Sequence, residues 1–542
     1  MIESEESTDS AQPAADRPSI SDQVAVWAFV AVIVAAVPII FQKARDQWFF
    51  LDEWSFLAGR DLDSVDGLLQ PHNEHWSTVP IVIYRVIWEF VGLHHYWPYL
   101  LVVVVFHLAL AVELRLVMRR AGVDAWIATA GASLFALFGG GRENITWAFQ
   151  MGFTGSVTFG VAAILFADHE PGSARARERD IAAAIAILIS LMSSGIGIPL
   201  TVALAVSVLL RRGWRSAAVV VMPGGALFLL WYLAYADRST PLAFNARAVE
   251  LAVNILRTTA ANLGATTRLG YLLVAAAVVG FAIAIIRHGK ERWRGEWAPV
   301  IALVVGAVAF VSITSVGRAL LTVESPSRYR HILLALTLPA IGVGLTALGR
   351  LWRPATWIAV ALLVAAVPVN VDRLEAQGTD RLTLGTPDVF LATASVEPPA
   401  AAPDDLRPFG RIAEDVTLGW LDVATREGKV PDPGPLTDLD RGTAELRVAL
   451  TTLWSSEGEG CREIGPLQPA RLDEGDVLRV SANQVALTEV RDGSPVSGPL
   501  NYWAVDNDGV RHDTLVVQVF RPMVLRVQAA GASAPTEVCD RP

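Results

Sequence analysis

The chain has 542 residues, of which 53% are hydrophobic and only 18% are charged, and its formal net charge is −10. In soluble domains about a quarter of all residues are charged, so this composition excludes an ordinary soluble enzyme. An acidic chain with no basic stripe is also unsuited to binding nucleic acid.

Residues 1–20 are rich in Ser, Glu, Asp and Ala, and they predict a disordered cytoplasmic N-terminus. They lack the basic start of a signal peptide, and no small-residue cleavage site follows the first apolar run. Between residues 21 and 372, apolar runs recur about eleven times, each with the ~18–20 residues that cross a bilayer. The sequence therefore predicts a polytopic α-helical membrane domain over 21–372, with a break at Ser193–Gly197 that is either a loop or a kink. A C-terminal domain, 373–542, follows it.

The distribution of arginine predicts the orientation of the helices. Short turns that are dense in Arg alternate with longer loops that are poor in it. The positive-inside rule assigns the dense turns to the cytoplasm, which leaves the N-terminus inside and the C-terminal domain outside. Only three of the 44 basic residues are Lys, a bias typical of GC-rich bacteria, so we expect a multi-pass protein of the bacterial plasma membrane.

The first external loop contains an acidic pair, Asp52-Glu53, flanked by Phe50 and Trp54. Adjacent carboxylates in a loop point in different directions, so one of them can act as a base while the other binds a hydroxyl or a cation. Partial burial between aromatic side chains would raise a carboxylate pKa toward a useful range. A solvated pair at the start of a helix is the alternative.

The same loop continues with Pro71-His72-Asn73-Glu74-His75-Trp76. His72, Glu74 and His75 offer the ligand types that suit a divalent cation such as Zn²⁺ or Mn²⁺. The same side chains are equally suited to hydrogen-bond a sugar, with Trp76 stacked beneath its ring. A polar loop that rests on lipid headgroups is the third interpretation.

Two further external loops carry polar residues. Arg142 and Glu143 follow three glycines, which allow the backbone to approach a ligand closely; a tight turn with an interfacial arginine is the alternative. Arg328 and Tyr329 stand where the chain re-enters the membrane. Because cations are disfavoured in external loops, this cluster indicates an anionic partner such as a lipid phosphate, or else headgroup anchoring.

The remaining external regions predict structure more than chemistry. Residues 79–93 and 236–270 have the spacing of amphipathic interfacial helices. In the C-terminal domain, alternating segments at 476–481, 484–490, 500–505, 513–520 and 523–527 predict a small antiparallel β-sandwich. Cys461 and Cys539 are the only two cysteines, and in an external domain they are expected to form one disulfide; two inert thiols are the alternative.

The position of the acidic pair resembles the GT-C superfamily of membrane glycosyltransferases. The string LDEWSF at residues 51–56 looks like the Asp-Glu motif that protein O-mannosyltransferases carry in their first external loop. The resemblance covers the topology of residues 20–372 and this short motif. It implies an inverting transferase that moves a sugar from a polyprenyl-phosphate donor to a cell-envelope glycan, lipid or protein acceptor.

The resemblance also implies a role for Asp52, as the base that deprotonates the acceptor hydroxyl, while Glu53 would orient the acceptor or a neighbouring group. Because a guanidinium matches a phosphate, Arg328 and Tyr329 are expected to hold the departing lipid phosphate. The reaction requires no catalytic nucleophile and no certain cofactor, and a divalent cation at the His72 loop stays open.

Two other classes compete with this interpretation. A transporter or lipid flippase would have a similar number of spans, together with broken helices and polar groups at mid-membrane depth. Only the Ser193–Gly197 break and the isolated His107 point in that direction. A passive membrane anchor for the acidic outer domain would have no need of three polar loops on one face.

Overall fold

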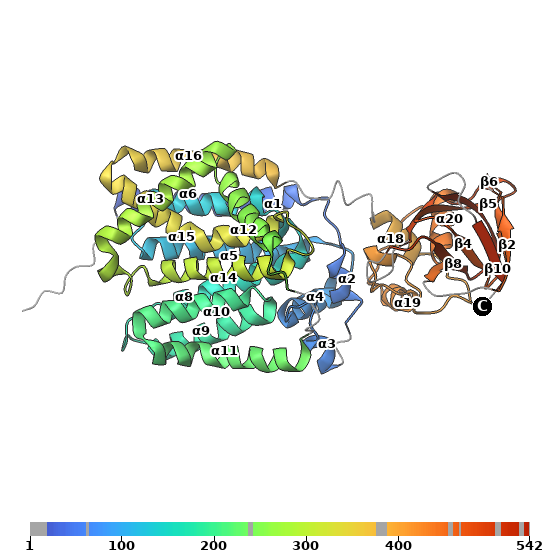
Figure 1. Ribbon diagram of the computed structural model, residues 1–542, viewed down its shortest axis with the longest axis horizontal. Coiled ribbons are helices and arrows are strands. Elements are labelled where there is room, and N and C mark those ends of the chain that lie inside the picture. The colour runs from blue at the N-terminus through green and yellow to red at the C-terminus, as the bar shows by residue number, and fades with distance from the viewer. Residues whose placement is uncertain are drawn as a thin grey trace, which may run out of the picture.

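The structure is a computed structural model that describes residues 19–60, 64–236, 242–374, 387–453, 459–465, 468–504, 511–529 and 536–540. These residues form a helical bundle and a strand-rich C-terminal region, seen at the left and right of Figure 1. The chain is a multi-pass helical membrane protein with an antiparallel sheet domain at its C-terminal end, which confirms the predicted fold class.

Eight helices in the described ranges are long and apolar enough to cross a membrane. Their outward faces are apolar as well: Leu230 and Leu233 on α11 are 63% and 59% exposed, as expected for side chains that face lipid. These helices are α1 (Ile20–Lys43), α5 (Trp97–Arg120), α8 (Met151–Ala167, preceded by a short 3₁₀ turn), α11 (Trp214–Tyr235), α13 (Thr267–Arg292), α14 (Ala298–Arg318), α15 (Ser327–Leu351) and α16 (Pro354–Arg373).

Three shorter helices lie in the same bundle: α6 (Ala125–Ala136), α9 (Ala176–Ser193) and α10 (Gly197–Arg212). Within the described ranges, eight helices therefore have the length and hydropathy of a membrane span, fewer than the eleven predicted. The other three do not qualify because α6 has 12 residues, α10 has 16, and α9 begins with a run of charged side chains. The break at Ser193–Gly197 separates α9 from α10 completely, so it is a loop between two helices. A Cβ on Gly197 would lie 2.7 Å from the Leu191 backbone, which explains the glycine at this close approach.

The two ends of the bundle differ in chemistry. At one end, arginines form ion pairs with the few acids nearby, for example Arg212 with Asp180 at 2.8 Å and Arg211 with Asp168 at 3.1 Å. We call this the arginine-rich end. The opposite end, called here the head end, carries α2 (Asp52–Leu57), α3 (Val65–Leu69) and α4 (Thr78–Val91) and lies toward the C-terminal region in Figure 1.

The two predicted interfacial helices are present. One is α4, and the other is α12 (Ala246–Asn262), which packs against α13, α14 and α15. The second external segment forms only short turns, namely η1 (Gly139–Gly141), α7 (Glu143–Thr146) and η2 (Ala148–Gln150).

The described part of the C-terminal region contains the helices α18 (Pro387–Ala394), η3 (Gly410–Ile412), α19 (Leu418–Arg426) and α20 (Asp438–Arg447), followed by ten strands in two antiparallel sheets. One sheet has the order β1 (Leu450–Leu453), β8 (Leu515–Val519), β4 (Val477–Val480), β10 (Thr536–Asp540) and β2 (Glu459–Ile464). The other contains β3 (Ala470–Leu472), β9 (Met523–Ala529), β5 (Gln484–Arg491), β6 (Ser494–Pro495) and β7 (Leu500–Trp503).

All five predicted strand segments are strands, and inward side chains such as Leu487, Leu478 and Val517 form a separate core between the sheets. The predicted disulfide is also present, since Cys461 on β2 is bonded to Cys539 on the neighbouring strand β10. A bond between adjacent strands closes a loop of the chain and stabilises the sandwich.

The first part of the C-terminal region packs on the head end through aromatic rings. Phe390 of α18 stacks on Trp54 of α2 at 4.6 Å, and Trp420 of α19 lies 5.3 Å from Trp88 of α4. The backbone N–H of Leu93 donates to the Lys429 carbonyl at 2.7 Å. Residues 387–430 therefore share a hydrophobic core with the bundle, and α2 is held between the two parts.

Candidate functional site

The three polar loops predicted from the sequence meet at the head end as three ion pairs. Asp52 lies 3.4 Å from His72, Arg318 contacts Glu74, and Arg328 lies 3.4 Å from Glu143. Each pair joins an acid to a base of a different segment. Within each pair one or both side chains stay partly exposed. His72, Glu74, Arg318 and Arg328 all act electrostatically on His75, so members of all three pairs lie in one region at the end of the bundle.

Asp52 is the accessible carboxylate of the acidic pair. It occupies the first position of α2, and its side chain is 39% exposed. The residue before it, Leu51, has a φ of 47°, a conformation that is uncommon for a non-glycine residue and that often marks functional sites. This turn sets the direction in which α2 starts and therefore the direction of the Asp52 side chain.

His72, from the following loop, places its Nε2 atom 3.4 Å from Asp52 Oδ1, without a hydrogen bond between them. Its backbone exchanges two 3.0 Å hydrogen bonds with His75, and its ring packs against Phe56 at 5.1 Å and Phe149 at 5.4 Å. His72 is thus fixed while Asp52 is exposed. A fixed imidazole beside an accessible carboxylate can orient that carboxylate toward a substrate proton.

Glu53 has a different position from the one expected. It is fully buried and accepts hydrogen bonds from Tyr84 Oη at 2.6 Å, Tyr96 Oη at 3.0 Å, Trp147 Nε1 at 3.0 Å and the Phe50 N–H at 2.8 Å. Burial raises the pKa of Glu53 to about 7, against the opposing effect of these donors. Its side chain ties α2 to three other segments. Of the two predicted roles, orienting the acceptor or orienting a neighbouring group, this buried position favours the second.

Replacing Glu53 by glutamine is expected to destabilise the protein strongly. Glutamine keeps one acceptor oxygen but directs its NH₂ group toward donors, and each unpaired buried donor costs about 1–3 kcal/mol. We expect a clear fall in the melting temperature of the detergent-solubilised protein. Glu250→Gln on the exposed face of α12 is the control. An unchanged melting temperature for Glu53→Gln would contradict the anchoring role.

The side chains of Glu74, His75 and Trp76 point to different partners. Glu74 pairs with Arg318, while the His75 ring packs on Phe153 at 5.5 Å. Burial, followed by the charge of Arg318, lowers the pKa of His75 to about 4. Trp76 stacks on Trp231 at 5.3 Å and is only 6% exposed, so its predicted role beneath a sugar ring is not supported by its packing.

These divergent directions also weaken the predicted cation site at the His72 loop. Among the described residues, the one set of three metal-ligand side chains that converge is Cys461, Glu537 and Cys539. The two cysteines of that set are joined in a disulfide and offer no thiolate.

The glycine run before Arg142 is explained by packing. A Cβ on Gly139 would lie 2.0 Å from the Asn370 carbonyl oxygen, and one on Gly141 would lie 2.6 Å from His331. The glycines bring this segment against α15 and α16, and so the predicted approach to a ligand is replaced by an approach to these helices. Glu143, which follows, is thereby placed beside Arg328.

Arg328 and Tyr329 begin α15 at the boundary of the bundle. The Arg328 guanidinium lies 5.2 Å from the Tyr329 ring and is 31% exposed, while Tyr329 is 6% exposed and packs against Phe310. Both the Arg328 backbone N–H and its side chain face Glu143 Oε2. The Arg328 guanidinium is therefore partly accessible to a ligand, and the buried Tyr329 ring packs against it.

A chain of buried polar groups continues from this site into the bundle. His107 lies 3.1 Å from the Ala136 carbonyl and 3.0 Å from His331, which lies 3.3 Å from Asn144. His107 must donate to a carbonyl, so it accepts from His331, and His331 in turn accepts from the Asn144 amide. His107 is therefore not isolated, as the sequence implied, but part of a chain that ends at the Arg328 carbonyl.

No sequence pattern indicated the partners Tyr84, Tyr96 and Trp147 of Glu53, or the His107–His331 pair. They come from segments that are far apart in the chain, and no local spacing relates them. Arg318 was visible only as one more cation in an external loop.

No protein-family model matches this chain, and no curated protein matches its sequence. Among solved structures, ArnT from Cupriavidus metallidurans in the apo state is similar with a TM-score of 0.47 and 14% identity, covering 76% of this chain and 90% of that one. ArnT from the same organism bound to undecaprenyl phosphate is similar with a TM-score of 0.43, 16% identity and the same coverage. At these TM-scores the likeness assigns no donor and no acceptor.

Proposed function

We propose that this protein is an inverting membrane glycosyltransferase of the GT-C type. It would move a sugar from a polyprenyl-phosphate donor to a glycan, lipid or protein acceptor of the cell envelope. The observation that supports this best is Asp52, a partly exposed carboxylate 3.4 Å from the His72 ring at the end of the bundle, together with Arg328 at the start of α15. A base and a cation at the membrane boundary suit a substrate with a polar head and an apolar tail.

In the proposed reaction, Asp52 accepts the proton of the acceptor hydroxyl as the oxygen attacks C1 of the sugar. The bond between C1 and the phosphate oxygen breaks, and the electron pair leaves with the lipid phosphate. One displacement of this kind inverts the anomeric centre. Arg328 stabilises the negative charge of the departing phosphate, exchanging part of its contact with Glu143 for the ligand.

A transferase that uses polyprenyl-linked sugars at the outer face of the membrane would need one orientation of the helical bundle in that membrane. The head end and the C-terminal region would lie outside the cell, with the arginine-rich end in the cytoplasm. Single cysteines at the exposed positions Glu397 and Glu178 test this in intact cells. We expect an impermeant maleimide to label the first and to spare the second. The reverse pattern would invert every assignment above.

The transporter interpretation is less well supported. It would use polar groups at mid-membrane depth, yet His107 and His331 are fully buried and hydrogen-bonded to protein groups.

Mass spectrometry of the lipids that co-purify with the protein is the most direct test of the class. A polyprenyl-phosphate sugar, or sugar transfer from one in vitro, is the expected result. A purified protein that transfers no sugar from a panel of such donors, and binds none of them, would contradict the proposal.

A further inference from the structure

A cavity lies at the arginine-rich end of the bundle, at the opposite end from the three ion pairs. It has a volume of about 50 Å³ and lies between α13, α15 and the turn that follows α5. Its apolar lining includes Ala284, Val343 and Ala347, and its basic lining includes His288, Arg292 and Arg350. The cavity is therefore amphipathic, with small aliphatic side chains on one side and basic groups on the other.

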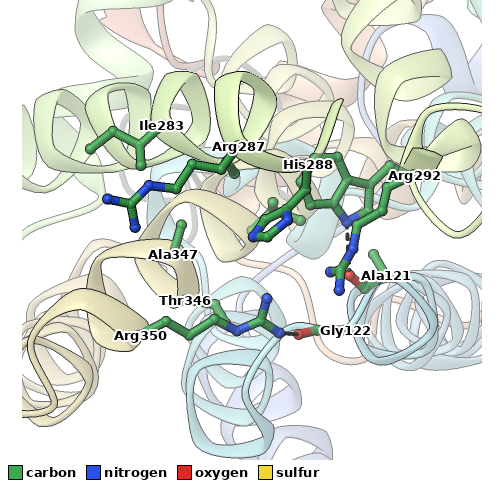
Figure 2. A pocket seen from close by; sticks show the side chains of 12 residues that line it. Ala121, Gly122, Ile283, Arg287, His288, Arg292, Thr346, Ala347 and Arg350 are labelled. Carbon is green, nitrogen blue, oxygen red and sulfur yellow. Dashed lines mark hydrogen bonds between the residues drawn. The ribbon is translucent and has the colours of Figure 1, made fainter. Parts of the chain in front are cut away.

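The basic groups converge on this cavity. Figure 2 shows the His288 imidazole and the guanidinium groups of Arg292 and Arg350 turned toward one another, while the Arg287 guanidinium points away. Arg350 donates one hydrogen bond of 3.0 Å to the Gly122 carbonyl. A guanidinium has five N–H donors, so Arg350 keeps others for a ligand.

The charges around the cavity are unbalanced. Arg292 is paired with Glu296 at 2.9 Å and lies 5.5 Å from the Trp297 ring. No carboxylate is among the described side chains that line the cavity itself. Glu296 compensates the charge of Arg292, whereas Arg350 forms no ion pair among the described contacts, so its positive charge is one that an anion would stabilise.

The surroundings indicate the source of that anion. Ile286 on α13 is 82% exposed and Leu351 on α15 is 47% exposed, so both helices present apolar surface beside the basic groups. An arginine at the end of a membrane helix lies at the depth of lipid phosphates. We propose that this cavity binds the phosphate group of an anionic membrane lipid, with the lipid chains lying along α13 and α15.

Native mass spectrometry of the full-length protein, titrated with phosphatidylglycerol in detergent, tests the proposal. Arg350→Gln removes one exposed guanidinium from the cavity. Arg353→Gln removes another exposed guanidinium only three residues along the chain, outside the cavity. We expect Arg350→Gln to raise the dissociation constant of the first bound lipid about tenfold, which is the effect of losing one charge-assisted contact. Arg353→Gln should leave this dissociation constant unchanged.

Each other outcome would overturn the proposal. Equal losses in both variants would mean that the whole basic end attracts lipids without a site. Unchanged binding in both variants would remove the cavity as the binding place. Competition by millimolar inorganic phosphate, with the same loss in Arg350→Gln, would show that the cavity takes free phosphate and not a lipid. The site and the proposed transfer reaction are independent, so failure of one leaves the other unaffected.

Discussion

Replacing Asp52 by asparagine is expected to abolish sugar transfer while leaving the protein inserted and folded. Asparagine has the same shape but does not accept a proton at neutral pH, and general-base catalysis contributes about 10²–10⁴-fold. The side chain of Asp52 is 39% exposed and its contact with His72 is 3.4 Å long, so little stability depends on its charge. We expect kcat to fall at least about a hundredfold, with little change in the donor KM.

Asp46→Asn is the matched control, because Asp46 lies in the same segment between α1 and α2, is 64% exposed and pairs only with Arg45 among the described contacts. Its activity should equal that of the wild type. Retention of more than about a tenth of the wild-type rate by Asp52→Asn would exclude Asp52 as the base. Equal loss in both variants would point to the charge of the segment and not to one carboxylate.

Losing the charge of Arg328 is expected to weaken donor binding much more than acceptor binding. A charge-assisted hydrogen bond to phosphate contributes about 1.5–3 kcal/mol. We therefore expect Arg328→Ala to raise the KM for the polyprenyl-phosphate sugar at least about tenfold, which corresponds to ~1.4 kcal/mol. Arg328→Lys should recover only part of this effect, since an ammonium group does not reproduce the bidentate geometry of a guanidinium.

The competing role of Arg328 is to anchor the helix end at lipid headgroups. Arg247→Ala on the exposed face of α12 removes such an interfacial cation away from the three ion pairs, and it serves as the control. Anchoring predicts that both variants lower the yield of protein in the membrane and leave both KM values unchanged. Donor and acceptor kinetics at matched expression separate the two roles, and an unchanged donor KM in Arg328→Ala would remove this residue from the site.

Local patterns in the sequence determined much of the architecture. Crossing a bilayer requires a long apolar run, which is a property of one segment, so the bundle helices were predictable without their partners. The same holds for strands such as Gln484–Arg491, where alternation alone indicates one buried face. The disulfide was predictable because only two cysteines exist and both lie in one domain.

Only the tertiary structure decided which polar side chains are exposed, which are buried, and which partners they contact. In the sequence, Asp52 and Glu53 are equivalent neighbours, yet the fold exposes the first and buries the second among Tyr84, Tyr96 and Trp147. The physical reason is that desolvating a carboxylate is costly unless several donors surround it, and those donors come from three other segments. For the same reason the pairing of Glu143 with Arg328, 185 residues later, became visible only when the chain was folded.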